Sequence, residues 1–79
     1  MTVLECERRR RGWSQSELGF YARVTQGEVS RFERRRAVPS VAYLERLARA
    51  LGRPPDGLLD EAEAAVERVA ETDGVRGPA

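Results

Sequence analysis

The sequence predicts an all-α fold in the form of a compact bundle of about five helices. Residues that can cap a helix recur before apolar residues spaced three and four apart, which is the helical period. No stretch alternates apolar and polar residues in the manner of a half-buried strand. With 79 residues, the chain forms one domain at most, for which we expect a stability of roughly 3–5 kcal/mol.

The first two helices are expected between clear start and stop signals. Thr2 can cap a first helix, and Gly12 can end it. The second helix begins at a capping box, in which the Ser14 hydroxyl accepts a hydrogen bond from the backbone of Glu17 and the Glu17 side chain reaches back. Gly19 leaves a place on the second helix where another helix could pack closely.

The third helix is expected soon after the second. Arg23 and Val24 interrupt the helical pattern, and Thr25 can cap a helix whose inward face carries Val29 and Phe32. Two helices joined by a turn of three or four residues have the spacing of a DNA-reading motif.

A fourth helix and a fifth helical segment complete the predicted bundle. Ser40 caps the fourth helix and Gly52 ends it. Its apolar stripe consists of Val41, Leu44, Leu47, Ala48 and Leu51. Asp56 is the expected cap of the fifth segment. The apolar residues of that segment, and the candidates for a dimer contact, are Leu58, Leu59, Ala62, Val66 and Val69. Two alternatives stand for this stripe: Leu58 and Leu59 close the core of the bundle, or the stripe holds a homodimer together.

Charge is distributed unevenly along the chain. Residues 1–53 carry twelve arginines against six glutamates, whereas residues 54–79 carry two arginines against seven acidic residues. The net charges of the two parts are therefore +6 and −5. This asymmetry indicates a body that binds a polyanion, joined to a separate acidic tail.

Several classes of function are disfavoured by what the sequence lacks. It has no histidine, a single cysteine, no glycine-rich phosphate loop and no spaced set of metal ligands, so we expect no enzyme, no metal and no cofactor. No apolar run is long enough to span a bilayer, so we expect no membrane role. Cys6 has no partner for a disulfide, and we expect it to be a small, partly buried filler and not a redox sensor. Residues 1–5 do not resemble a signal peptide, so we expect a cytoplasmic protein.

The order and spacing of several short strings resemble the Cro/C1-type (XRE-like) helix-turn-helix family. These strings are Ser14-Gln15-Ser16-Glu17-Leu18, Val24-Thr25-Gln26, Val29-Ser30-Arg31-Phe32-Glu33, Pro39-Ser40 and the stretch 44–52. The resemblance covers about residues 4–59 and implies a lambda-repressor-like domain whose third helix lies in the major groove. It also implies frequent homodimers on palindromic operators. The expected organisation is a helix-turn-helix DNA-binding domain at 1–59, an acidic helical extension at 60–72 and a flexible tail at 73–79.

The outward side of the third helix supplies the candidates for base contacts. Gln26 can bond adenine and Arg31 can bond guanine, each through two hydrogen bonds. Thr25, Gly27 and Ser30 complete the set, because the first residues of such a helix point toward base edges. For Thr25, helix capping alone is an equal alternative.

Phosphate contacts are expected on either side of the third helix. Ser14 and Gln15 lie at the start of the second helix, where backbone amides favour an anion. Arg34, Arg35 and Arg36 follow the third helix, although a run of solvated charges is an alternative reading. The resemblance further implies a structural ion pair between Arg8 and Glu33.

Three residues depart from the family pattern. Arg23 and Arg35 stand where the family commonly has glycine, and a non-glycine residue with positive φ costs on the order of 1 kcal/mol. Either the local turns differ or the protein tolerates this strain. Gly27 stands where the family usually has a polar side chain that touches a base, so sequence preference is harder to predict than DNA binding.

Together these observations predict a sequence-specific, repressor-like regulator of transcription that binds double-stranded DNA and reads the major groove with the helix at 25–33. The alternative is a protein-interaction module, or an antitoxin-like partner, that acts through the acidic C-terminal helix.

Overall fold

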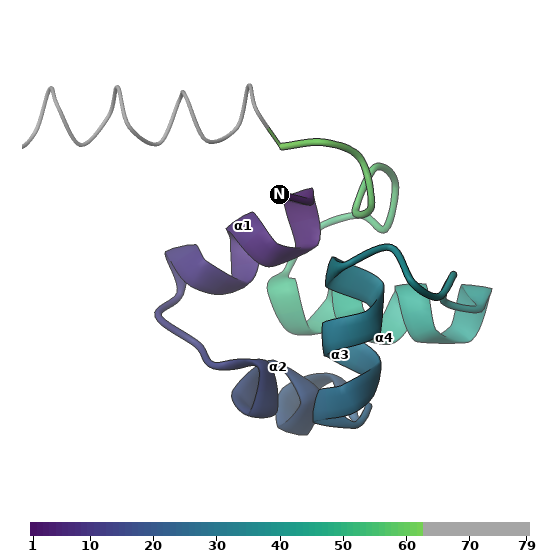
Figure 1. Cartoon of the computed structure of the whole chain (residues 1–79). Helices are drawn as coiled ribbons and strands as arrows, with labels where there is room; N and C mark the ends of the chain where they lie inside the picture. The colour runs from purple at the N-terminus through teal and green to yellow at the C-terminus, as the bar shows by residue number, and fades with distance from the viewer. Residues whose placement is uncertain (63–79) are drawn as a thin grey trace, which may run out of the picture.

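The computed structural model describes residues 1–62, and within them the fold is all-helical (Figure 1). Its helices are α1 (Val3–Arg10), α2 (Gln15–Ala22), α3 (Gln26–Glu33) and α4 (Val41–Leu51). The only β-type pairing among the described residues is an isolated antiparallel bridge between Thr2 and Glu61. The predicted fold class is therefore confirmed, with four helices in place of about five.

Each helix begins at the residue that the sequence predicts as its cap. The side chains of Thr2, Ser14, Thr25 and Ser40 each accept a hydrogen bond from the backbone N–H three residues later. Ser14 belongs to the predicted capping box, and Thr25 forms a second one with Glu28. These caps satisfy donors that the first turn of a helix leaves unpaired, and so they fix where each helix starts.

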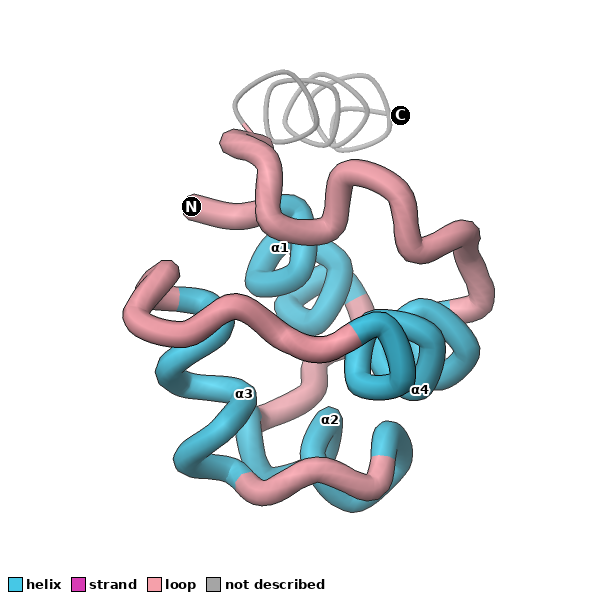
Figure 2. The backbone as a smooth tube through the Cα atoms, turned by 90° about the vertical axis from the view of Figure 1, so that its right-hand side faces the viewer, coloured by secondary structure: helices cyan, strands magenta, loops and turns pink. Residues whose placement is uncertain are grey.

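The core lies where the four helices converge (Figure 2). Its fully buried leucine and valine side chains are Leu4, Leu18, Val29, Leu47, Leu51 and Leu58. Gly19 allows a close approach, but to the chain that follows α2 in the sequence: a Cβ at this position would lie 2.6 Å from the carbonyl oxygen of Val24. The turn between α2 and α3 therefore packs directly onto α2.

The expected fifth helix is wrong over the described residues 56–62. This segment forms turns, and Gly57 adopts a φ of +76°, which ends any helix that Asp56 could start. The chain then runs beside the start of α1. There the backbone N–H of Val3 donates to the Asp60 carbonyl at 2.9 Å and that of Leu4 donates to the Leu58 carbonyl at 2.8 Å. The segment thus accepts hydrogen bonds from two donors in the first turn of α1 that have no partner within that helix.

The expectation of a dimer contact on this segment also needs correction. Leu58 and Ala62 are each 1% exposed and belong to the core of their own chain. Leu59 is partly buried against the same core. These residues are therefore not presented to a second copy, and the alternative in which Leu58 and Leu59 close the core fits the structure. Val66, Val69 and the remainder of the expected 60–72 extension and 73–79 tail lie outside the described residues.

Truncation of Leu58 is expected to unfold much of the protein. Leu58→Ala should lower the free energy of unfolding by about 2–5 kcal/mol, because it removes a buried side chain and leaves a cavity. Val38→Ala is the control, since Val38 is 88% exposed. Urea denaturation followed by far-ultraviolet circular dichroism measures both variants. Equal stability of the two would show that residues 58–62 do not form part of the core.

Candidate nucleic-acid interface

A buried ion pair connects α1 to the end of α3. Nε of Arg8 donates to Oε2 of Glu33 at 2.6 Å, and Nη2 donates to Oε1 at 3.1 Å. The two side chains are only 9% and 2% exposed. The third nitrogen, Nη1, donates to the backbone carbonyl of Trp13 at 2.7 Å, so the guanidinium also fixes the loop between α1 and α2. Both buried charges are thus fully partnered.

The hydrogen-bond network continues from this ion pair to the molecular surface. Nε2 of Gln15 donates to Oε1 of Glu33 at 3.0 Å, and Oε1 of Gln15 accepts from Nε2 of Gln26 at 2.7 Å. Gln15 is the first residue of α2 and Gln26 the first residue of α3. The starts of the two helices are therefore joined to each other and anchored to a buried charge.

The inner side of α3 faces the core and its outer side is open. Val29, Phe32 and Glu33 are buried, whereas Gln26 and Arg31 are exposed. Gly27 and Ser30 are half-buried. Gln26 and Arg31 are thus the long polar side chains that α3 exposes for hydrogen bonding.

Thr25 and Glu28 form reciprocal hydrogen bonds at the start of α3. The Thr25 hydroxyl accepts from the Glu28 backbone at 3.0 Å and donates to the Glu28 carboxylate at 3.1 Å. The carboxylate also accepts from the Thr25 backbone at 2.9 Å. This backbone hydrogen bond is the largest of the effects that lower the pKa of Glu28 below its ordinary value of 4.5. Both side chains therefore act as helix caps.

Arg31 lies next to Gly27, one turn earlier on α3. A Cβ built at Gly27 would stand 3.5 Å from Nη1 of Arg31. The guanidinium therefore rests over the first turn of α3, in space that a side chain longer than alanine at position 27 would need. The sequence shows only that Gly27 and Arg31 are four residues apart. It does not show that the Arg31 side chain turns toward Gly27, so this contact could not be predicted.

The candidate phosphate contacts differ in their surroundings. Ser14 is exposed at the start of α2, although its hydroxyl is used in capping. Arg34 and Arg36 are exposed just after α3. Arg35 turns toward the C-terminal segment, where its Nε donates to the Leu59 carbonyl at 3.2 Å and its Nη2 lies 3.4 Å from the Glu61 carboxylate.

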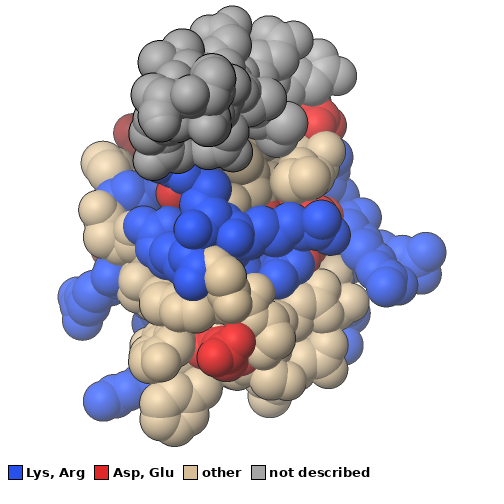
Figure 3. Space-filling view, turned by 90° about the vertical axis from the view of Figure 1, so that its left-hand side faces the viewer, with Lys and Arg blue, Asp and Glu red and all other residues tan. Residues whose placement is uncertain are grey.

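Arginine side chains also gather on the face where α1 ends (Figure 3). In the sequence, Arg9, Arg10 and Arg11 follow one another near that end, and each pairs with a glutamate of the same helix. Arg9 contacts Glu5 at 2.6 Å, while the other two contact Glu7 at 3.5 and 2.9 Å. Part of this positive charge is therefore balanced within α1.

The two arginines at glycine-like positions adopt the left-handed conformation. Arg23 has a φ of 62° and Arg35 a φ of 57°. The turns thus keep the shape that glycine favours, and the chain carries a strain on the order of 1 kcal/mol at each residue.

The fold and the exposed α3 surface define a helix-turn-helix protein, in which α2 and α3 are joined by a tight turn. A family model described as helix-turn-helix matches residues 7–58, so the chain belongs to the helix-turn-helix family of Cro/C1 type. This family assignment identifies the chain as a DNA-binding regulator. Comparisons with curated proteins and with solved structures give no match.

Residues 1–62 contain neither a candidate membrane span nor a candidate metal site. None of their helices is long and apolar enough to cross a membrane. These residues also contain no group of histidine, cysteine, aspartate and glutamate side chains that could hold a metal ion.

Loss of the buried guanidinium is expected to act on folding before it acts on DNA binding. Arg8→Ala should lower the free energy of unfolding by roughly 3–5 kcal/mol, because it leaves the Glu33 carboxylate buried and unpaired. Arg9→Ala is the matched control, since its exposed pair with Glu5 contributes about 1 kcal/mol at most. Denaturant titrations give the two free energies. An Arg8→Ala protein that unfolds like the wild type but fails to bind DNA would contradict this structural role.

Proposed function

We propose that the protein is a sequence-specific regulator of transcription that inserts α3 into the major groove of double-stranded DNA. The observation that carries this proposal is the exposed start of α3, whose Gln26 is tied through Gln15 to the buried Glu33 and Arg8 pair. A side chain held in this way loses little freedom on binding, which favours selective contact with a base edge. Repression would follow if the bound protein blocks access to a promoter.

Gln26 and Arg31 are the proposed base-reading residues. Glutamine pairs well with adenine, and arginine with guanine, in the major groove. Gly27 supports the proposal indirectly, because its missing side chain leaves room for the Arg31 guanidinium over the first turn. Ser30 is half-buried and the Thr25 hydroxyl is engaged in capping, so we assign them smaller contributions.

Phosphate contacts are proposed at both ends of this surface. Ser14 and Gln15 present the start of α2, where the helix dipole and free backbone amides favour an anion. Arg34 and Arg36 extend from the other end and are exposed. Arg35 follows the same end of α3, but its side chain is hydrogen-bonded to residues 59–61. We therefore assign it the role of holding this end of α3 in place.

A homodimer on a palindromic operator is part of the proposal. Two symmetry-related copies would place their α3 helices in half-sites roughly 34–36 Å apart, which is one turn of B-DNA. Val38 and Val41 are 88% and 72% exposed near the start of α4. These two valines offer an apolar contact to a second copy, in place of the buried Leu58 and Ala62.

Selection of bound duplexes from a random pool tests the function directly. We expect a two-fold symmetric motif, and we expect Arg31→Ala to relax the preference at one base pair of each half-site. The loss should amount to about 1–3 kcal/mol for the preferred base, the usual value of a bidentate pair. Arg9→Ala should keep the same motif. Recovery of no motif, with binding that disappears uniformly as salt is raised, would contradict sequence-specific recognition.

Sedimentation with and without operator-length DNA tests the dimer. The wild type should bind as two copies per duplex, and Val38→Asp with Val41→Asp should reduce this to one, because the added charges repel each other across a symmetric contact. The free energy of unfolding should change little, since both sites are exposed. A wild-type protein that remains one copy per duplex would rule out the palindrome.

A further inference from the structure

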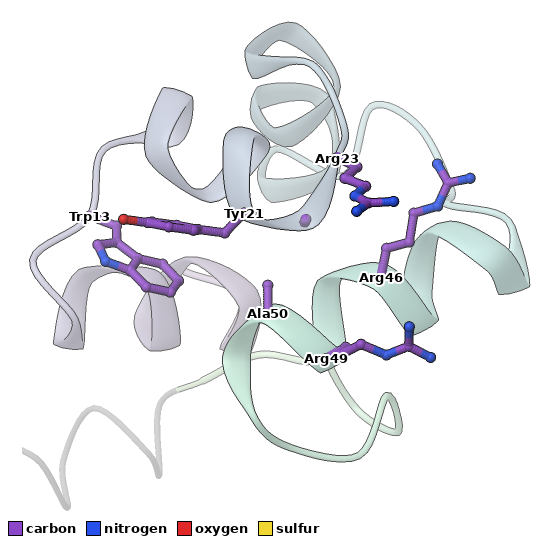
Figure 4. A pocket seen from close by; sticks show the side chains of 7 residues that line it. Trp13, Tyr21, Arg23, Arg46, Arg49 and Ala50 are labelled. Atoms are coloured by element: carbon purple, nitrogen blue, oxygen red, sulfur yellow. The ribbon is translucent and has the colours of Figure 1, made fainter.

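A pocket of about 480 Å³ lies between the end of α2 and the C-terminal half of α4 (Figure 4). Its lining consists of Trp13, Tyr21, Ala22, Arg23, Arg46, Arg49 and Ala50. None of these residues belongs to α3. The pocket is therefore separate from the surface proposed to read DNA, and its chemistry requires its own explanation.

The two ends of the pocket differ in chemistry. At one end the rings of Trp13 and Tyr21 pack together, with centroids 4.6 Å apart and an angle of 32° between the planes. At the other end the pocket is lined by Arg23, Arg46 and Arg49, whose side chains extend away from the two rings (Figure 4). The Arg46 guanidinium lies over the Tyr43 ring, with Cζ 5.2 Å from the ring centroid. The pocket thus has an aromatic end and an end that carries a cluster of three arginine residues.

This cluster differs from the arginine run of α1 in having no acidic partner among residues 1–62. The arginines of α1 pair with Glu5 and Glu7, whereas no carboxylate of the described residues lies within 4.0 Å of Arg23, Arg46 or Arg49. Three positive charges thus line one pocket without a counter-charge among the described residues. An anion that enters the pocket would supply one.

Arg23 joins the pocket lining from the turn between α2 and α3. Its left-handed conformation, with a φ of 62°, is the one in which a helix commonly ends. The turn therefore sets where this arginine meets the pocket.

We propose that this pocket binds a nucleoside polyphosphate. The planar base would lie against the part of the Trp13 and Tyr21 pair that the two rings leave uncovered, since Tyr21 is 53% exposed and every base offers a face for stacking on aromatic rings. The phosphates would bind between the three arginines, whose planar forks match phosphate oxygens. The volume lies within the range of about 300–1,000 Å³ that is typical of small-molecule sites, which favours a compact ligand over an extended acidic peptide.

The location of the pocket would allow a bound ligand to affect the position of α3. Arg23 is the residue that ends α2, and α3 begins three positions later. A ligand held by Arg23 therefore contacts the turn that sets the position of α3. The pocket itself does not depend on the proposed DNA sequence specificity, and it can be tested on the free protein.

The single tryptophan makes the test direct, because Trp13 lines the pocket and is the only tryptophan in the chain. ATP and GTP are titrated while tryptophan fluorescence is recorded, with tripolyphosphate, adenosine and hexaglutamate as partial mimics. We expect a saturable change with ATP or GTP and at least about tenfold weaker binding of each mimic, since each contains half of the recognised groups or lacks the phosphate geometry.

The variant Arg46→Gln with Arg49→Gln should weaken nucleotide binding by at least about tenfold, as expected for the loss of charge-assisted hydrogen bonds. Arg9→Gln with Arg10→Gln is the matched control, because it removes the same charge from exposed positions of α1 and should leave binding within about twofold. All four substituted arginines are exposed, so thermal unfolding should remain unchanged.

Four results would overturn the proposal. Absence of any saturable change with ATP or GTP would exclude the site. Equal binding of tripolyphosphate or hexaglutamate would show that the aromatic end recognises nothing. Equal weakening by the α1 control would reduce the effect to net charge. Displacement of the nucleotide by duplex DNA, together with weaker DNA binding of Arg46→Gln with Arg49→Gln, would assign the arginines to the DNA backbone.

Discussion

The ion pair between Arg8 and Glu33 is the interaction on which the rest of the structure depends. Its guanidinium uses three nitrogens to join α1, the loop before α2 and the last residue of α3. Buried charges are costly unless every donor and acceptor is satisfied, so this arrangement tolerates little displacement of any of the three elements. The orientation of α3 relative to the body is therefore fixed by electrostatics as well as by the packing of Val29 and Phe32.

The same network links stability to recognition. Glu33 is buried at one end of α3, while Gln26 is exposed at the other, and Gln15 connects them across the start of α2. The side chain that we propose to contact DNA is thus connected to two residues that are buried in the interior. This connection needs no additional core volume.

Local signals in the sequence predicted the four helices. Tertiary contacts explain why the expected fifth helix is wrong and why several side-chain directions could not be predicted. Each of the caps at Thr2, Ser14, Thr25 and Ser40 acts over three residues, so its effect is visible in the sequence. The segment after Asp56 carries a helical apolar pattern, but its carbonyls pair with the start of α1, which no local pattern reveals. The exposure of Gln26 and Arg31 followed from the helical period. The path of the Arg31 side chain over Gly27, the turn of Arg35 toward Leu59 and the grouping of the pocket arginines depend on packing between distant residues.

The pairing of residues 58–62 with the start of α1 also bears on how the chain reaches this fold. The turn and helices from 14 to 33 form through neighbours in sequence, which favours early formation. The contact between Thr2 and Glu61 instead closes a loop that spans nearly the whole described chain. Closing so long a loop has an entropic cost, and it can be offset only when Leu58 and Ala62 reach the core. This last segment therefore ties the two ends of the described chain together across the core that the four helices share.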